Sequence, residues 1–247
     1  MDFGLSGKRA AVAGASAGLG LGVARALVAE GVHVAICGRD RERIDAAARE
    51  LGGDTVALVV DVGDAEGGRR FVAEARAALG GVDILVANAG GPPAGTFAQT
   101  PLERYDAALQ LSLMSTIAMC YEAVDDMIGR GWGRIVAITS VSARQPIPNL
   151  VLSNTARAGL TGFLKTLATE VAAHGVTVNS VQPGLHATQR LRQLRGDLIA
   201  AGRETPMGVL GDPDDFGRVV AFLCSTAARF LTGVALPVDG GASSALQ

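Results

Sequence analysis

The heptapeptide Gly14-Ala15-Ser16-Ala17-Gly18-Leu19-Gly20 stands between a short apolar run and the start of a helical pattern. The run before it, Arg9–Ala13, is predicted to be a strand, and Gly18–Glu30 is predicted to be a helix. Glycine permits a sharp turn and lets backbone N–H groups approach a diphosphate at the positive end of the helix. Because it follows a strand and opens a helix, the spacing Gly-x-x-x-Gly-x-Gly predicts a dinucleotide-binding turn, with a plain glycine-rich connection as the alternative.

The same alternation of apolar run and helical pattern continues along the chain. Further strands are predicted at Val32–Cys37, Thr55–Val60, Asp83–Ala87, Arg134–Thr139, Val176–Val181 and Val234–Val238. Further helices are predicted at Arg41–Leu51, Ala65–Leu79, Leu102–Ile128, Val151–Ala173 and Pro213–Ser225. This order is typical of one doubly wound α/β domain, a Rossmann fold with a seven-stranded parallel sheet, spanning residues 1–247. The long irregular stretch 185–212 is predicted to be a flap over the ligand site.

The composition excludes several classes of protein. The 247 residues include 49% hydrophobic and 19% charged residues, which excludes intrinsic disorder. Because 22 basic residues face 24 acidic ones, we expect no nucleic-acid partner. We see no apolar run long enough for a membrane span and no secretion signal, and we expect a cytoplasmic protein. Cys37, Cys120 and Cys224 are odd in number and far apart, which predicts buried thiols and no metal site.

The end of the second predicted strand indicates the type of cofactor. An NAD enzyme needs a carboxylate there, eighteen residues beyond Gly20, to accept a hydrogen bond from the ribose 2′-hydroxyl. The chain has Gly38-Arg39-Asp40 instead, and the planar guanidinium of Arg39 can pair with a 2′-phosphate. Asp40 is predicted to cap the next helix. The sequence therefore favours NADP over NAD, with a solvated Arg39 as the alternative.

At these motifs the chain resembles the short-chain dehydrogenase/reductase family, near the β-ketoacyl carrier-protein reductases, over nearly all of its length. The matching motifs are the turn from Ala13 to Gly20, Asp61-Val62, Ala87-Asn88-Ala89-Gly90, Pro183-Gly184 and Val238-Asp239-Gly240-Gly241. The resemblance implies that Asp61-Val62 meet the adenine and that Thr188 holds the nicotinamide carboxamide. It also implies a homotetramer or homodimer, formed through the two long helices and the last strand. The predicted cofactor-binding residues are Gly14, Ser16, Gly18, Leu19, Gly20, Arg39, Asp61, Val62, Asn88, Ala89, Gly90, Arg157, Pro183, Gly184 and Thr188.

The family's catalytic positions are mostly altered. Its serine matches Ser140, but its tyrosine, thirteen residues on, is Ser153, and its lysine is Arg157. Its asparagine matches Ser112, and no shift of register restores a Tyr-x-x-x-Lys pair. An aliphatic hydroxyl is a far weaker acid than a phenol, and arginine does not relay a proton as lysine does. Arg157 can still bind the nicotinamide ribose, and it shares one helix face with Ser153.

Several residues are candidates to replace the tyrosine. His186, in the loop expected beside the nicotinamide, titrates near neutrality, although a solvent-exposed loop histidine is the alternative. Arg144 is a candidate to bind a substrate carbonyl or carboxylate, with a surface charge as the alternative, and Asn154 is a further candidate as a hydrogen-bond donor. The flap also carries four arginines, which suit an anionic substrate or a solvated helix face: Arg190, Arg192, Arg195 and Arg203.

Three functions follow from these observations. The first is an NADP-dependent oxidoreductase acting on a carbonyl or alcohol substrate, either a small molecule or an acyl-carrier thioester, with Ser140, Ser153, Arg157, Ser112 and His186 as candidate catalytic residues. The second is an NADP-binding sensor or partner subunit without redox turnover. The third is a dehydratase or isomerase that reuses the same pocket.

Overall fold

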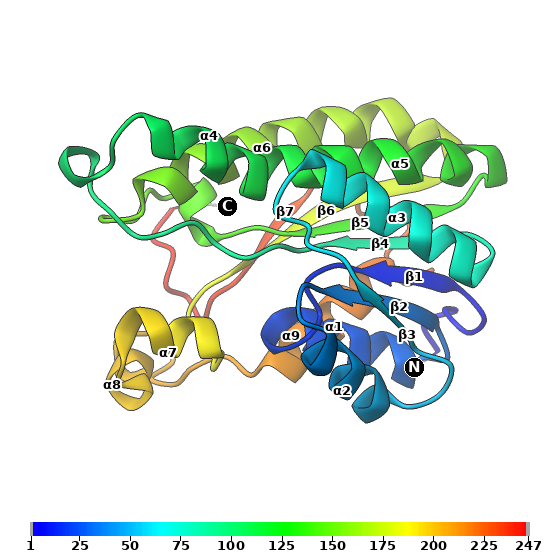
Figure 1. Cartoon of the computed structure of the whole chain (residues 1–247), viewed down its shortest axis with the longest axis horizontal. Coiled ribbons are helices and arrows are strands. Elements are labelled where there is room, and N and C mark those ends of the chain that lie inside the picture. The colour runs from blue at the N-terminus through cyan, green and yellow to red at the C-terminus, as the bar shows by residue number, and fades with distance from the viewer. Residues whose placement is uncertain (1, 246–247) are drawn as a thin grey trace.

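The computed structural model of the chain describes residues 2–245 as one α/β unit (Figure 1). Its strands are β1 Arg9–Val12, β2 His33–Gly38, β3 Val56–Val59, β4 Ile84–Ala87, β5 Gly133–Ile138, β6 Val176–Pro183 and β7 Ala235–Val238. Its α-helices are α1 Gly18–Ala29, α2 Arg41–Leu51, α3 Ala65–Leu79, α4 Glu103–Leu109, α5 Ser115–Arg130, α6 Val151–Val171, α7 Gln189–Arg195, α8 Leu198–Arg203 and α9 Pro213–Cys224. Shorter helical turns are η1 Phe97–Gln99, η2 Gln110–Met114, η3 Val141–Ala143 and η4 Ala172–His174.

The seven strands form one sheet in the order β3-β2-β1-β4-β5-β6-β7, and every neighbouring pair is parallel. The predicted doubly wound seven-stranded sheet is therefore confirmed. The strand order reverses between β1 and β4, and ligands of such sheets bind outside the carboxyl ends of the strands at this point. The glycine turn after β1 and the segment after β4 both leave the sheet there.

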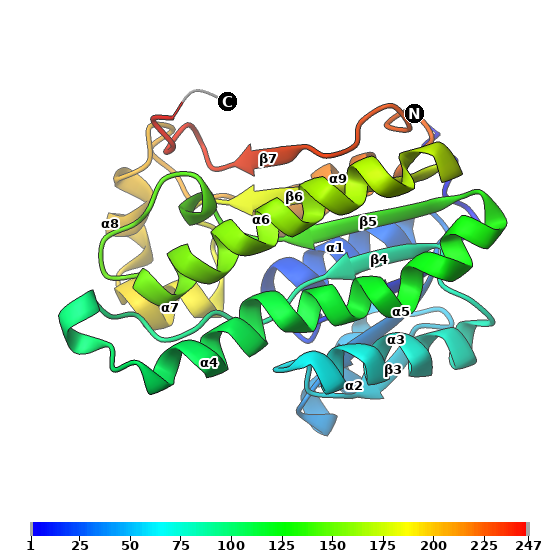
Figure 2. The same ribbon diagram turned by 90° about the horizontal axis from the view of Figure 1, so that it is seen from above.

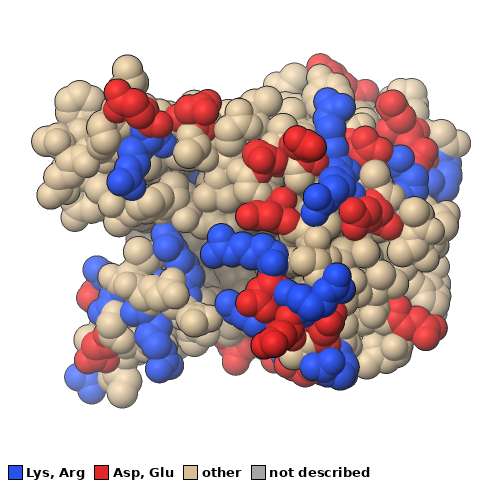
Figure 3. Space-filling view, in the orientation of Figure 1, with Lys and Arg blue, Asp and Glu red and all other residues tan. Residues whose placement is uncertain are grey.

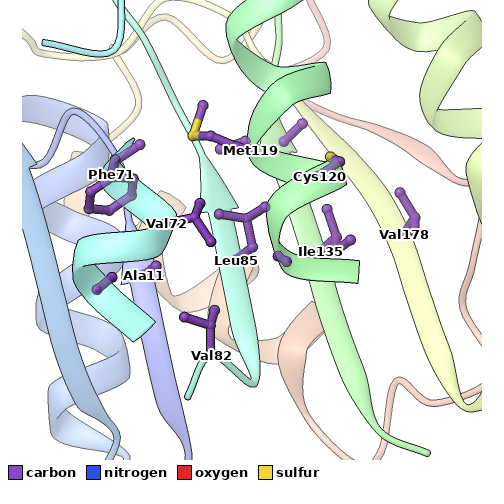
Figure 4. Packing of buried hydrophobic residues seen from close by; sticks show 14 of the residues in the cluster. Ala11, Phe71, Val72, Val82, Leu85, Met119, Cys120, Ile135 and Val178 are labelled. Atoms are coloured by element: carbon purple, nitrogen blue, oxygen red, sulfur yellow. The ribbon is translucent and has the colours of Figure 1, made fainter. Parts of the chain in front are cut away.

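Helices cover both faces of the sheet, as Figure 2 shows from above. Along β1, Ala11 packs with α3, α5 and α6, whereas Ala10 and Val12 pack with α1 and α9. Figure 4 shows the first of these layers, where Phe71 and Val72 of α3 and Met119 of α5 lie against the strands. Burying both faces explains why the strands read as continuous apolar runs. The three cysteines are buried, as predicted, and burial raises the pKa of each thiol to about 12.

The predicted helix Leu102–Ile128 needs correction. It consists of α4 and α5 joined by the π-helical turn η2, which inserts an extra residue into the helical repeat and buries Ser112. The combined segment Glu103–Arg130 has the length and apolar composition of a membrane span, contrary to our expectation that no segment would. Its apolar residues Met119, Ala123 and Met127 pack into the core together with residues of α3 and the strands.

The flap 185–212 is not irregular, because it contains α7 and α8. Each has a side-chain cap at its start: Thr188 accepts from the Leu191 amide, and Asp197 accepts from the Ile199 and Ala200 amides. These helices have only seven and six residues and bury little more than Leu191 and Ala201, so their apolar periodicity is too short to detect.

Candidate functional site

The glycine turn packs so closely on the end of β4 that two of its glycines have no room for a side chain. A Cβ on Gly20 would lie 2.5 Å from the Gly14 carbonyl oxygen, and one on Gly14 would lie 2.9 Å from Asn88 Nδ2. Gly14 also has a φ of 58°, in the left-handed region. Asn88 Nδ2 donates to the carbonyls of Ala13 and Gly14 at 3.2 and 3.1 Å. Asn88 therefore fixes the turn against β4.

Helix α1 begins without a side-chain cap. Its N-cap residue is Ala17, and its first turn has no acidic residue. By contrast, α2, α3 and α9 begin at Asp40, Asp64 and Asp212, each of which accepts a hydrogen bond from the first turn. The first amides of α1 are thus left for another acceptor, and the residues present fit a diphosphate.

The end of β2 lies beside this turn. A Cβ on Gly38 would stand 3.2 Å from the Ser16 Cβ, so a larger side chain there would displace Ser16. Asp40 caps α2 as predicted, accepting from the Arg43 amide at 3.0 Å. Arg39 is exposed and makes no hydrogen bond or ion pair within residues 2–245. Ser16 and Arg39 therefore lie at one edge of the site, where they would hold the 2′-phosphate of NADP.

The other strand ends carry the remaining predicted cofactor residues. Asp61 is exposed just beyond β3, whereas Val62 is buried and its carbonyl accepts from Ser115 Oγ at 2.7 Å. Ala89 and Gly90 follow Asn88, and Gly90 has open space around it. A Cβ on Gly184 would lie 2.7 Å from the Asp239 Cα, so Pro183-Gly184 is packed against the last motif.

Thr188 closes the site from the flap side. Its hydroxyl accepts from the Leu191 amide at 3.2 Å and so begins α7, while its hydrogen remains available for donation. Its Cγ2 lies 3.5 Å from the position of a Cβ on Gly18, and Leu19 follows in the first turn of α1. The flap therefore lies beside the glycine turn.

Three serines gather where β5 ends and α6 begins. Ser140 Oγ accepts from the Ser142 amide at 3.1 Å, and Ser142 Oγ lies 3.4 Å from Ser153 Oγ. The structure thus brings together Ser140 and Ser153, which sequence reasoning selected, with Ser142, which it missed. The pattern Ser140-Val141-Ser142, typical of a serine-capped turn, is the signal that could have found it.

Arg157 lies one helical turn after Ser153 on α6. Its side chain is buried, and Nη1 donates to the Ile138 carbonyl at 3.1 Å. No carboxylate pairs with it in the described part of the chain, and burial lowers the pKa of its guanidinium to about 10. It still carries its charge at neutral pH. The site thus combines hydroxyl donors with a fixed cation, and together these groups can polarise a carbonyl. The site contains no phenol that could give up a proton.

Ser112 is placed differently. Its hydroxyl is fully buried in η2, which packs against α6, and it has no hydrogen-bond partner within residues 2–245. A catalytic role for Ser112 stays a prediction.

The alternative interpretation of His186 as a solvent-exposed loop histidine is wrong. The imidazole is buried, with its ring edge-on to Phe216 at 5.1 Å between centroids. Nδ1 lies 3.3 Å from the Gly184 carbonyl, and a Cβ on Gly211 would stand 2.6 Å from the ring. Burial lowers the pKa of this histidine. These contacts place His186 beside Phe216 of α9, and its backbone pairs with Gly211. A catalytic role for His186 stays a prediction.

Two of the other candidate donors have structural roles. Asn154 exchanges two hydrogen bonds with the backbone of Ile147, at 3.2 and 3.0 Å, so its amide is occupied. Arg190 Nη2 donates to the Pro92 carbonyl at 2.8 Å and links the flap to the segment after β4. Arg195 is paired with Glu204, which reduces the predicted positive charge of the flap. Arg144 is exposed.

The remaining flap arginines, Arg192 and Arg203, are exposed. Figure 3 shows arginine and lysine side chains beside a hollow between two lobes of the molecule. No group of three metal-ligating side chains is found among residues 2–245.

Comparison with known proteins extends over nearly the whole chain. A family model described as enoyl-(acyl carrier protein) reductase matches residues 14–243. Dehydrogenase/reductase SDR family member 4 of Sus scrofa is 36% identical over 98% of this chain and 89% of its own length.

Two solved structures bear on the site. L-sorbose reductase from Gluconobacter frateurii, complexed with NADPH and L-sorbose, has a TM-score of 0.93 and 33% identity, with 100% of both chains covered. A short chain oxidoreductase from Pseudomonas aeruginosa PAO1, described as containing an atypical catalytic center, has a TM-score of 0.91 and 33% identity, covering 98% of this chain and 99% of its own.

Proposed function

Because this chain belongs to the short-chain dehydrogenase/reductase family, we propose that it is an NADP-dependent oxidoreductase of a carbonyl or alcohol substrate with an atypical active site. The choice of NADP is supported by the exposed, unpaired Arg39 and by the NADPH bound to the structural relative L-sorbose reductase. The substrate is a small molecule or an acyl-carrier thioester, the latter in keeping with the description of the matching family model.

A dinucleotide bound here would supply or accept the hydride. The uncapped start of α1 would hold its diphosphate, and Arg39 would hold its 2′-phosphate. The hydroxyls of Ser140 and Ser153 donate hydrogen bonds to the substrate oxygen and orient it. Arg157, one helical turn after Ser153, contributes a fixed positive charge that stabilises the negative charge developing on that oxygen. In the absence of a phenol, the alkoxide left by hydride transfer would take its proton from solvent water.

One observation carries this proposal: three serines lie together at the carboxyl end of β5, where the buried Arg157 also donates to the Ile138 carbonyl. Restoring the family's acid tests it. We expect the double variant Ser153→Tyr, Arg157→Lys to increase the rate of reduction of a generic ketone by NADPH, because a phenol beside an ammonium can give up a proton. Unchanged or lower turnover in a folded, NADPH-binding double variant would contradict a site of this kind.

The second candidate is NADP binding without turnover, as a sensor or partner subunit. The replacement of the tyrosine by Ser153 favours it, because an aliphatic hydroxyl is a far weaker acid than a phenol. A single-turnover experiment separates the two functions. A reductase oxidises NADPH in the presence of a substrate, so the absorbance of NADPH falls, whereas a sensor binds NADPH and its absorbance does not change.

We also propose that the protein is a homotetramer, or a homodimer, located in the cytoplasm. Tyr121 and Met114 of the helix α4–α5 region are 66% and 37% exposed, which supports contacts between copies through the long helices. Sedimentation velocity would give the number of copies.

A further inference from the structure

A cavity of about 270 Å³ lies between α6 and the edge of the sheet formed by β6 and β7. Figure 2 shows α6 lying over β6, with β7 beside it. The cavity lining includes two cationic, two hydroxyl and two apolar side chains: Arg144, Lys165, Thr161, Ser180, Leu164 and Val178. No carboxylate among residues 2–245 lines it. The cavity therefore suits a negatively charged ligand.

Lys165 is held at this cavity by the loop before β7. Its Nζ donates to the Gly233 carbonyl at 3.2 Å. A Cβ on Gly233 would lie 2.8 Å from Nζ, so the glycine leaves the space that the ammonium occupies. An ammonium has three N–H donors, and Lys165 forms no ion pair within residues 2–245. Its remaining donors are therefore available to a ligand.

Ser180 contributes a buried hydroxyl to the cavity. It is 2% exposed and lies two residues beyond Val178, which packs in the core beneath α6, so both side chains lie on the α6 face of β6. The Ser180 amide donates to the Val234 carbonyl at 2.8 Å, but in the described part of the chain its hydroxyl makes no hydrogen bond. Thr161 differs, because its hydroxyl donates to the Arg157 carbonyl at 2.8 Å and has no hydrogen left for an anion. Since an unpartnered buried hydroxyl costs free energy, an acceptor atom in the cavity would stabilise Ser180.

The cavity is separate from the predicted cofactor site, because none of the residues that line it is a predicted cofactor-binding residue. The two sites share structural elements. Arg144 ends η3, the turn that begins at Ser140, and the Arg144 amide donates to the Val141 carbonyl at 3.1 Å. Thr161 is bonded to the backbone of Arg157. A ligand in the cavity could thus be bound at the same time as NADP, at the far end of the turn that carries the serines.

We propose that this cavity binds a phosphate group, either as inorganic phosphate or as the phosphate of a small organic monoester. The Lys165 ammonium and the Ser180 hydroxyl would donate to its oxygens, and the planar guanidinium of Arg144 would pair with two of them. A phosphomonoester carries a charge of about −1.5 to −2 at neutral pH, which matches the two cations. Leu164 and Val178 would contact the carbon atoms of a monoester. The inference is independent of the proposed function, since Lys165 and Ser180 have no part in it.

Calorimetric titration with inorganic phosphate and with ethyl phosphate tests the proposal. The protein is first saturated with NADP⁺, so that the glycine turn and Arg39 are already occupied. We expect one phosphate to bind per chain, and Lys165→Met to weaken its binding about ten- to a hundredfold, because a charged donor is lost. Ser180→Ala, a smaller change that keeps the test possible if Lys165→Met does not fold, should weaken binding about two- to tenfold. Tighter binding of ethyl phosphate would support an organic monoester as the ligand, and tighter binding of inorganic phosphate would support the free anion.

Lys8→Met is the matched control, because Lys8 is the chain's other lysine and lies outside the cavity, with Nζ 4.1 Å from the centre of the Trp132 ring. It removes the same charge and should leave the affinity for phosphate unchanged. Equal weakening by Lys8→Met and Lys165→Met, or equal heats from chloride at the same ionic strength, would overturn the inference.

Three further outcomes are decisive. Phosphate that binds only before NADP⁺ is added would occupy the cofactor site, and the inference would be wrong. If the wild type takes up no phosphate and Lys165→Met changes the sedimentation coefficient, the cavity is an interface between copies, which also overturns the inference. If NADP⁺ does not bind but phosphate uptake still depends on Lys165, the proposed function fails and this inference stands.

Discussion

Replacing the buried arginine at the site, Arg157→Met, should leave the protein as stable as the wild type or more stable, while weakening NADPH binding. Burial lowers the pKa of this guanidinium to about 10, so keeping the charge there costs about 3 kcal/mol. Methionine has a similar length and no charge. The substitution leaves the Ile138 carbonyl without its donor, which costs about 1–3 kcal/mol. We therefore expect a change in unfolding free energy between zero and about 2 kcal/mol in favour of the variant.

Arg134→Met is the matched control, because Arg134 is also buried and burial also lowers the pKa of its guanidinium. Its surroundings differ. Nη1 donates to the carbonyls of Gly133 and Gly175, and the guanidinium lies 4.4 Å from the centre of the Trp132 ring. Losing these contacts, at the amino end of β5, should destabilise the protein by about 1–3 kcal/mol.

Both variants are measured by urea unfolding at neutral pH and by calorimetric titration with NADPH. We expect Arg134→Met to lower the urea midpoint and leave NADPH affinity unchanged. We expect Arg157→Met to keep or raise the urea midpoint and to weaken NADPH binding. A loss of more than about 2 kcal/mol in Arg157→Met, with NADPH affinity preserved, would refute the reasoning, since Arg157 would then support the fold and not the ligand.

Gly20→Ala should destabilise the protein by about 1–3 kcal/mol and weaken NADPH binding, because the added Cβ would lie 2.5 Å from the Gly14 carbonyl oxygen. The control is Gly129→Ala in α5, where the added Cβ meets nothing within 4 Å and should raise the thermal midpoint slightly. Equal thermal midpoints for the two variants would contradict the argument that Gly20 is closely packed. Wild-type protein should lose stability as the pH falls through about 6.5, because the unfolded chain protonates His186 there while burial lowers the pKa of this residue in the folded state. His186→Asn should reduce this loss, measured as the change in thermal midpoint between about pH 7.5 and about pH 5.5. The exposed His33→Asn should not reduce it, and equal effects of the two substitutions would count against a buried, neutral His186.

The parts of the fold with long, regular periodicity were predictable from the sequence. The strand runs and α1, α2, α3 and α9 lie within a few residues of their predicted bounds, because apolar faces of this length specify burial on their own. The π-helical turn η2 was not predictable, since one inserted residue leaves the apolar pattern of the surrounding helix almost unchanged.

The candidate site likewise has features that were predictable from the sequence and features that were not. The left-handed φ of Gly14, the close approach of Gly20 to the Gly14 carbonyl and the cap at Asp40 involve residues close in sequence, so local stereochemistry makes them predictable. His186 could not be placed from the sequence, because its burial depends on Gly211 and Phe216, which are 25 and 30 residues away. The same holds for Ser142, whose contact with Ser153 depends on how η3 meets α6.

The preference for NADPH over NADH tests the account most directly. Calorimetric titration of the wild type and of Arg39→Ser with both nucleotides measures whether the guanidinium at the end of β2 binds the 2′-phosphate. We expect the wild type to bind NADPH on the order of ten- to a hundredfold more tightly than NADH, and Arg39→Ser to remove this difference without weakening NADH binding. Equal affinities for the two nucleotides in the wild type, or no binding of either, would contradict the account.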